Sequence, residues 1–155
     1  MEHEARTLVD RPVSTVYDQW TQFESFPRFM EGVSRVKQLD DSSTRWDVEI
    51  GGVERSFVAD IVEQKPDDHI RWESRTDPSH QGEVRFFPRG DSTEVSLWMN
   101  FEPEGWVEKA GDSLGFVQRR VEGDLGRFKS FIEDRASATG AWRGSVSDGT
   151  PNDRL

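Results

Sequence analysis

The feature that most constrains this chain is a long stretch, from Gly32 to Pro103, in which apolar and polar side chains alternate. A period of two residues is typical of half-buried β-strands, because successive side chains point to opposite faces of a sheet. Turn-forming residues interrupt the alternation at 40–43, 51–52, 65–68, 77–79 and 89–92. Such short connections join neighbouring strands in antiparallel fashion. The stretch therefore predicts an antiparallel meander.

Two of the predicted hairpins indicate which side chains face the core. A two-residue turn at Gly51-Gly52 places Trp46 opposite Phe57 and Val48 opposite Arg55. A four-residue loop at 89–92 sets the register of the next hairpin in the same way, and apolar side chains again meet apolar ones. The resulting core face comprises Trp46, Val48, Ile50, Phe57, Ala59, Ile61, Ile70, Trp72, Val84, Phe86, Val95, Leu97, Met99 and Phe101.

Helical periodicity flanks the alternating stretch on both sides. Residues 12–20 place apolar side chains three or four positions apart after Pro12, a residue suited to a first helical turn. A shorter helix is expected at 24–30, and the weak alternation at 4–9 predicts an edge strand. Residues 104–136 predict a long amphipathic helix. Glycines at 105, 111, 115, 123 and 126 each cost about 1 kcal/mol relative to alanine, so we expect this helix to be bent, mobile or locally unwound.

The length of 155 residues suits one domain. We expect it to span residues 1–135, because residues 136–155 are rich in Gly, Ser and Asp, contain only Trp142 as a large aromatic, and indicate a flexible tail. No apolar run approaches the length of a membrane span, and the first residues have no apolar signal region. We therefore expect a cytoplasmic protein.

Composition excludes several kinds of chemistry. The net charge of -10 repels phosphate backbones, which argues against nucleic acid as a partner. The chain has no cysteine, so thiol nucleophiles and disulfides are excluded. Its three histidines, at positions 3, 69 and 80, lack the spacing of metal ligands. We expect no metal site and no cofactor.

The order of elements, one strand, two short helices, a meander and a long last helix, predicts an α+β helix-grip fold. In that fold a curved antiparallel sheet, here of about seven strands, wraps around the C-terminal helix. The segments 9–33, 46–48, 59–74, 82–88, 93–105 and 123–134 resemble the START-like (SRPBCC) superfamily, in its polyketide cyclase/dehydrase branch, which is similar to the coenzyme-Q-binding START proteins. Members of this superfamily include cyclases and carriers of lipids and quinones.

The resemblance implies a cavity between the concave face of the sheet and the long helix. We expect it to open near residues 104–115, with the glycine-rich start of the helix as a gate. The alternative is that the large aromatic side chains simply fill the core. The predicted ligand-binding residues are Trp46, Val48, Arg55, Phe57, Ile61, Trp72, Ser74, Phe86, Leu97, Met99, Leu114, Val117 and Val121.

Three residues are weak candidates for catalysis. Arg55 falls on the core face, where its guanidinium could hold a ligand carbonyl, enolate or carboxylate, or else extend past the hairpin or pair with Glu31 or Glu54. His80 could act as an acid or base, although a histidine just after a turn is more often solvated. Tyr17 could donate its hydroxyl into the cavity, or pack as a core ring with that hydroxyl capped.

Two functions follow from this pattern. The first is binding or carriage of a hydrophobic small molecule, such as a polyketide, quinone or lipid, without chemistry. The alternative is a polyketide cyclase/dehydrase that catalyses aldol cyclisation and dehydration, which requires a positioned acid or base and a group that stabilises an enolate. Because few polar residues fall on the concave face, we favour binding. Trp98 and Phe87, on the outer face of the sheet, could anchor a homodimer.

Overall fold

The computed structural model describes residues 2–50, 52–75, 79–101 and 113–152. Its elements are β1 (Glu2–Val9), α1 (Val13–Trp20), the 3-10 helix η1 (Phe23–Arg28), β2 (Val33–Asp40), β3 (Ser43–Ile50), β4 (Val53–Lys65), β5 (His69–Ser74), β6 (His80–Arg89), β7 (Ser92–Phe101), α3 (Ser113–Glu133), β8 (Ser145–Ser147) and β9 (Thr150–Asn152). This order is the α+β arrangement that the sequence predicts.

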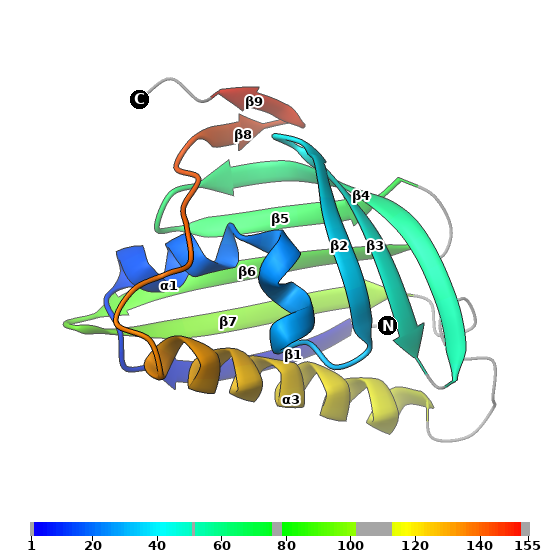
Figure 1. Cartoon of the computed structure of the whole chain (residues 1–155), viewed down its shortest axis with the longest axis horizontal. Coiled ribbons are helices and arrows are strands. Elements are labelled where there is room, and N and C mark those ends of the chain that lie inside the picture. Colours follow the sequence, from blue (N-terminus) through cyan, green and yellow to red (C-terminus); the bar gives the residue numbers. More distant parts are fainter. Residues whose placement is uncertain (1, 51, 76–78, 102–112, 153–155) are drawn as a thin grey trace.

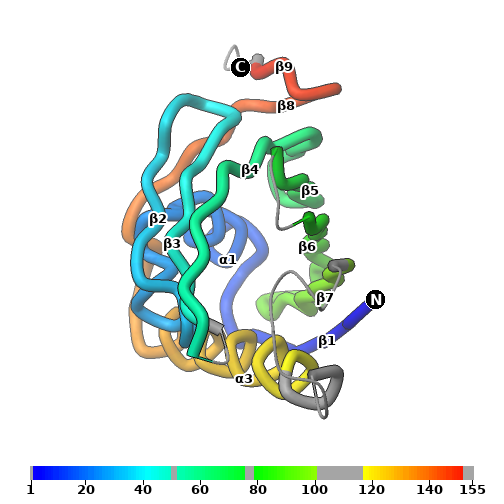
Figure 2. The backbone as a smooth tube through the Cα atoms, turned by 90° about the vertical axis from the view of Figure 1, so that its right-hand side faces the viewer, coloured from blue at the N-terminus to red at the C-terminus, as the bar shows by residue number. Residues whose placement is uncertain are grey.

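The strands form one antiparallel sheet in the order β1-β7-β6-β5-β4-β3-β2 (Figure 1). Strands β2 to β7 are consecutive neighbours, which confirms the predicted meander, and β1 lies at the edge as expected. Figure 2 shows that the sheet is strongly bent, with β2 and β3 on one side of α1, β5 to β7 on the other, and α3 below. The helix-grip fold is therefore confirmed. The described part of the chain has more strands than the seven expected, because β8 and β9 extend the sheet beside β4.

The predicted hairpin registers are correct. Trp46 pairs with Phe57 and Val48 with Arg55 across the β3–β4 turn. In the same way, the register of β6 and β7 sets their apolar residues opposite one another. Of the predicted core-face side chains, Val48, Phe57, Ala59, Ile61, Ile70, Val84, Phe86, Val95 and Leu97 are buried. The side chains of Ile50 and Phe101 lie outside the described residues.

Helix α1 lies inside the bent sheet because its apolar residues share one face. Tyr17 and Trp20 are fully buried on this face, and both rings meet Phe86 of β6 edge-on. Trp20 also packs against Phe26 of η1 and Phe128 of α3, with ring centroids 5.7 and 4.6 Å away. Edge-to-face aromatic contacts at these distances are favourable. Trp20 thus joins the sheet, η1 and α3 in one core.

The segment after α3 is not a flexible tail, so that expectation is corrected for residues 136–152. The orange segment in Figure 1 runs from the end of α3 past α1 to β8. Strand β8 pairs with the C-terminal end of β4, and Val146 is buried there. Asp148 and Gly149 both have positive φ, as in a two-residue hairpin turn. The Asp-Gly pair is the hairpin signal that the overall composition of this segment concealed.

Helix α3 is continuous through Gly115, Gly123 and Gly126, so the expected unwinding does not occur at these three residues. Most of the expected opening and gate at 104–115, namely residues 104–112, lies outside the described residues. Within the described part of the chain, no helix is long and apolar enough to cross a membrane.

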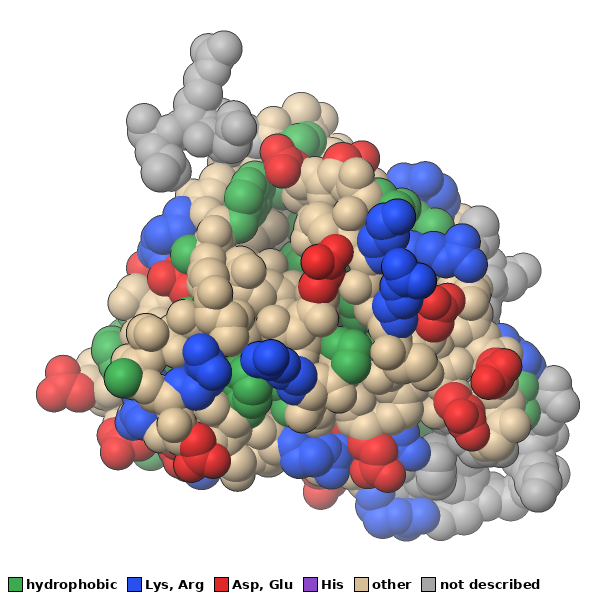
Figure 3. Space-filling view, viewed as in Figure 1, with side chains coloured by type: hydrophobic (Ala, Val, Ile, Leu, Met, Phe, Trp, Pro, Cys, Tyr) green, Lys and Arg blue, Asp and Glu red, His purple; other side chains and the backbone are tan. Residues whose placement is uncertain are grey.

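The outer surface of the sheet carries mixed charges. Lys and Arg side chains gather over β2 and β3 in Figure 3, where Arg35, Lys37 and Arg45 are exposed. Lys37 lies directly opposite Arg45. Because β2 ends the sheet, such charges discourage pairing of this edge with another strand.

The two aromatic residues proposed as dimer anchors lie on the outer face of the sheet, and both are half-buried. The indole N–H of Trp98 donates to a carboxylate oxygen of Glu2 at 3.0 Å. The guanidinium of Arg89 lies 5.8 Å from the centre of the Phe87 ring. Both rings are thus partly covered by neighbouring side chains, and the homodimer stays a prediction.

Candidate functional site

Two adjoining cavities lie between the sheet, η1 and α3. The aromatic cavity, of about 60 Å³, is lined by Trp20, Phe23, Phe26, Met30, Thr44, Trp46, Ile61, Trp72, Leu97, Met99, Val121 and Asp124. The histidine cavity, of about 110 Å³, is lined by Met30, Glu31, Gly32, Val33, Trp46, Val48, Phe57, His80, Met99, Val117, Arg120, Val121 and Asp124. The two cavities share Met30, Trp46, Met99, Val121 and Asp124. We treat them as two lobes of one site.

Most of the predicted cavity residues line these lobes. They are Trp46, Val48, Phe57, Ile61, Trp72, Leu97, Met99, Val117 and Val121. Phe86 is not among them, because Tyr17 and Trp20 of α1 cover its ring, so its predicted place in the cavity wall is corrected to the core. The sequence predicts helix α1 but does not predict that it lies inside the bent sheet. The side chain of Leu114 lies outside the described residues.

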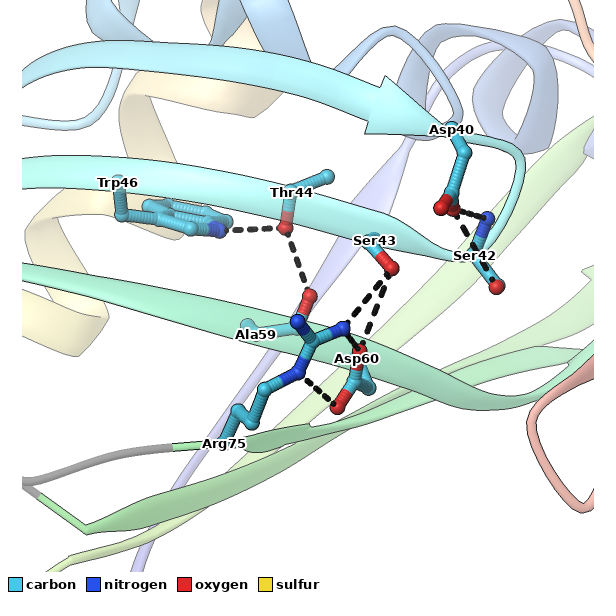
Figure 4. A network of polar contacts seen from close by, with 8 residues as sticks. All are labelled: Asp40, Ser42, Ser43, Thr44, Trp46, Ala59, Asp60 and Arg75. Atoms are coloured by element: carbon cyan, nitrogen blue, oxygen red, sulfur yellow. Dashed lines mark hydrogen bonds and ion pairs between the residues drawn. The ribbon is translucent and has the colours of Figure 1, made fainter.

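The wall that Trp46 forms is held by hydrogen bonds within the sheet (Figure 4). The Trp46 indole N–H donates to Thr44 Oγ1 at 2.8 Å, and the Thr44 hydroxyl donates to the Ala59 carbonyl at 3.2 Å. The Trp46 ring also stacks on Phe57 at 6.0 Å, with only 10° between the ring planes. The hydrogen bond to Thr44 fixes the indole N–H, and the Phe57 ring fixes the face of the indole. The wall that the two lobes share is therefore preorganised.

Trp72 occupies its place because the residue opposite it on β6 is Gly82. A Cβ atom added at Gly82 would lie 2.2 Å from Trp72 Cζ2, well inside van der Waals contact. The indole therefore lies across the glycine backbone and reaches the aromatic cavity. Glycine at this position permits a close approach that any other side chain would prevent.

His80 is buried in the wall of the histidine cavity, so the expectation of a solvated ring is wrong. Its ring meets Phe57 edge-on at 4.7 Å, and its backbone N–H donates to Ser74 Oγ at 2.8 Å. Burial lowers the pKa of His80 to about 4, so the imidazole is neutral near pH 7. Ser74 lines neither lobe but holds the start of β6 on which His80 lies.

Asp124 is the functional candidate that sequence reasoning missed. This carboxylate of α3 lines both lobes, accepts a hydrogen bond from the Glu31 backbone N–H at 3.0 Å, and forms an ion pair with Arg127. Burial raises its pKa to about 6, although Arg127 opposes this change. The signal was present in the sequence, because Asp124 follows Val117 and Val121 at helical spacing on the core face of α3.

The other two catalytic candidates lie outside the cavity walls. Arg55 is half-buried, lines neither lobe, and donates to the Glu54 backbone carbonyl at 3.0 Å. Tyr17 is buried, and its hydroxyl accepts a hydrogen bond from Gln64 Nε2 at 3.0 Å. Burial raises the pKa of Tyr17 to about 12. The alternative reading, a packed ring with a capped hydroxyl, describes Tyr17 correctly.

The site thus combines an apolar interior with two titratable groups. His80 and Asp124 line the same lobe. The pKa of Asp124, about 6, is close to neutrality, as a general acid or base requires, whereas the His80 ring is neutral near pH 7. Among the described residues, no three His, Asp or Glu side chains form a group that could hold a metal ion. The geometry suits a mainly apolar ligand with a small polar part.

Comparison with known proteins gives concordant results. Residues 9–129 match the family described as polyketide cyclase/dehydrase and lipid transport. An uncharacterized 17.2 kDa protein of Streptomyces lincolnensis is 49% identical over 137 residues, which cover 87% of this chain and 91% of that protein.

Solved structures share the fold. The Zhui aromatase/cyclase from Streptomyces sp. R1128 has a TM-score of 0.73 at 19% identity, over 91% of this chain and 98% of that one. A START superfamily protein from Mycobacterium smegmatis has a TM-score of 0.67 at 19% identity, over 86% of this chain and 95% of that one. At these identities the likeness extends to the fold alone.

Proposed function

This chain belongs to the polyketide cyclase/dehydrase and lipid transport family, and we propose that it binds a hydrophobic small molecule in the two-lobed site. The observation that supports this most is the lining of the aromatic cavity. It consists of aromatic and aliphatic side chains except for Thr44 and Asp124. Concave, mainly apolar sites with a few convergent polar groups are the usual form of small-molecule sites.

A buried indole narrows the ligand class. Trp20 lines the aromatic cavity and is 1% exposed, and its indole N–H has no hydrogen-bond acceptor among the described residues. A buried donor without an acceptor costs about 1–3 kcal/mol, which a ligand oxygen would recover. This favours a ligand with a carbonyl or hydroxyl oxygen, such as a polyketide or quinone, over a plain hydrocarbon chain.

The size of the lobes limits how the ligand enters. Sites for drug-sized molecules usually have roughly 300–1,000 Å³, more than the two lobes provide. Met30 and Met99 line both lobes, and methionine side chains change conformation easily. We infer that a ligand of one or two rings fits with small movements, and that a larger one displaces these methionines.

A second function, polyketide cyclisation and dehydration, is favoured by one observation, the presence of Asp124 and His80 in the same lobe. In an aldol cyclisation a base removes a proton from a carbon next to a carbonyl. The resulting carbanion then forms a C–C bond with a second carbonyl, whose oxygen takes up a proton. Ionised Asp124 would act as the base, and protonated Asp124 would return the proton. For the loss of water, Asp124, ionised again, would remove a second proton from the carbon next to the carbonyl and transfer it to the leaving hydroxyl group, so that a C=C bond forms as water departs.

One experiment separates binding from catalysis. Native mass spectrometry of the protein purified from its own cells identifies a co-purified ligand, which is then incubated with fresh protein. Unchanged ligand supports binding alone, whereas a cyclised or dehydrated product supports catalysis. If there is turnover, Asp124→Asn should abolish it while ligand stays bound, and Arg55→Ala, outside both lobes, is the matched control.

The ligand class has its own test. Trp20→Phe keeps most of the ring but removes the indole N–H, so it should weaken binding of a quinone such as menadione more than binding of naphthalene. Equal weakening of both ligands would contradict the proposed role of this N–H group. Absence of binding of either ligand to the wild-type protein would contradict the proposed function itself.

A further inference from the structure

A separate groove lies outside η1, against the segment that follows α3. It has a volume of about 600 Å³ and is lined by residues of η1, of β2 and its following turn, of β4 and of 139–142. It shares only Phe23 with the aromatic cavity. The segment is held beside it by hydrogen bonds that include those from Trp142 N–H to Thr21 Oγ1 at 3.1 Å and from Thr139 N–H to Gln19 Oε1 at 2.8 Å. The groove therefore exists because residues 136–152 pack on the domain.

The amide donors at this groove are engaged within the protein. Gln22 Nε2 donates to Thr21 Oγ1 at 3.0 Å, and Gln38 Nε2 donates to the Asp40 carbonyl at 2.6 Å. The only cationic side chain in the lining, Arg28, has its guanidinium 5.9 Å from the centre of the Phe131 ring. One N–H group of each of these amides is thus already used within the protein.

Acceptors, in contrast, are in excess. A bulge in β4 after Ile61 turns Gln64 inward, where its Nε2 donates to the Tyr17 hydroxyl. Its Oε1 atom is buried and has no hydrogen-bond donor among the described residues. A buried amide oxygen in this state is costly and is normally satisfied by a water molecule or a ligand. Gln64 is thus an acceptor at the floor of the groove.

Carboxylates stand at the groove as well. One oxygen of Glu24 accepts a hydrogen bond from the Gln38 backbone N–H at 2.9 Å. Asp41 is exposed and forms no ion pair or hydrogen bond with the described residues. The groove lining therefore carries two carboxylates and one guanidinium, within a chain whose net charge is -10.

We propose that this groove binds a small organic amine. Its ammonium group pairs with Glu24 and Asp41, its apolar part lies against Phe23 and the half-buried Trp142, and a donor on the ligand or a bridging water satisfies Gln64 Oε1. An aromatic face beside carboxylates is a suitable environment for an organic cation. A neutral polyol fits less well, because it carries no positive charge to pair with the two carboxylates.

Calorimetric titration of the full chain with 2-phenylethylamine tests the proposal. The controls 2-phenylethanol and 3-phenylpropionate have nearly the same shape but are neutral and anionic. We expect saturable binding of the amine that weakens with added salt, and no binding of the anion. The double variant Glu24→Gln/Asp41→Asn should bind the amine more weakly, by up to about 25-fold, because each exposed ion pair contributes up to about fivefold. Asp91→Asn, an exposed carboxylate on the β6–β7 turn, is the matched control and should bind as wild type.

Three results would overturn the proposal. These are no saturable binding of the amine, equal binding of amine and alcohol, and unchanged amine binding in the double variant with native circular dichroism. Either of the last two results would indicate that the probe binds in the apolar two-lobed site and not in the groove. Because the alcohol reports on that site separately, failure of this proposal is distinguishable from failure of the proposed function.

Discussion

Asp124 makes a quantitative prediction about stability and pH. Its pKa is raised from the ordinary 3.8 to about 6, chiefly because burial disfavours the charged carboxylate. Such a change corresponds to about 3 kcal/mol of preference for the protonated form in the folded state. The side chain is 14% exposed, so solvent screens this preference little. We therefore expect Asp124→Asn, a neutral substitute of the same shape, to alter the pH dependence of unfolding.

The sign follows from proton binding. Between about pH 4 and pH 6 the folded protein keeps this proton and the unfolded chain releases it, so the contribution of Asp124 to stability decreases as pH rises. The destabilisation caused by the buried, charged carboxylate of Asp124 is fully present above about pH 6 and absent below about pH 4. Asp124→Asn removes it. The variant should gain up to about 3 kcal/mol relative to wild type at pH 7.5 and nothing comparable at pH 4. The opposing attraction of Arg127 is already included in the pKa of about 6.

Urea unfolding followed by tryptophan fluorescence at pH 4 and pH 7.5 measures this difference directly. Taking wild type minus variant at each pH removes the contribution of other titrating groups, including Asp60, whose pKa is lowered by its hydrogen bond to Arg75. Equal differences at the two pH values would refute the reasoning. A variant that lost more stability at pH 7.5 than at pH 4 would show that the Arg127 ion pair outweighs burial.

Four further changes have defined outcomes. Gly82→Ala should displace Trp72, which would lie 2.2 Å from the new methyl group, and should cost about 1–3 kcal/mol with a changed fluorescence spectrum; an unchanged spectrum would contradict this. Gly126→Ala, in exposed mid-helix with no atom within 4 Å of the added methyl group, should stabilise by about 1 kcal/mol in urea unfolding. Val121→Phe should fill the shared part of both lobes and abolish displaceable binding of an apolar dye, with retained binding counting against the site. Ending the chain at Arg135 should lower the melting temperature, since it uncovers β4 and α1, and an unchanged value would indicate that the last segment contributes no stability.

The features of this fold that the sequence predicts correctly are those determined by residues close together in the chain. Short turns set the hairpin registers, and those registers placed Trp46 and Phe57 side by side correctly. Phe86 could not be assigned to the core rather than the cavity, because that depends on α1 entering the bent sheet, which no local pattern encodes. His80 was misjudged for a similar reason, since its burial comes from packing against Phe57 on a different strand.

Charge and composition misled in two other places. Asp124 lies among Arg120, Arg127 and Lys129, a sequence context typical of a solvated helix face, and only its spacing from Val121 indicates the cavity. The polar composition of 136–155 concealed the Asp148-Gly149 turn in the same way. In both cases residue spacing was more informative than the local proportion of polar residues.

The pairing of β1 with β7 has a consequence for biosynthesis. Glu2 of β1 pairs with Asn100 of β7, and the end of β4 pairs with β8, where Glu63 lies opposite Ser147. A ribosome releases the chain from its N-terminal end, so β1 and α1 emerge long before the strands that cover them. Contacts so distant in sequence form slowly, because loop closure opposes them. The apolar faces of these first elements therefore stay uncovered until the later strands have been synthesised.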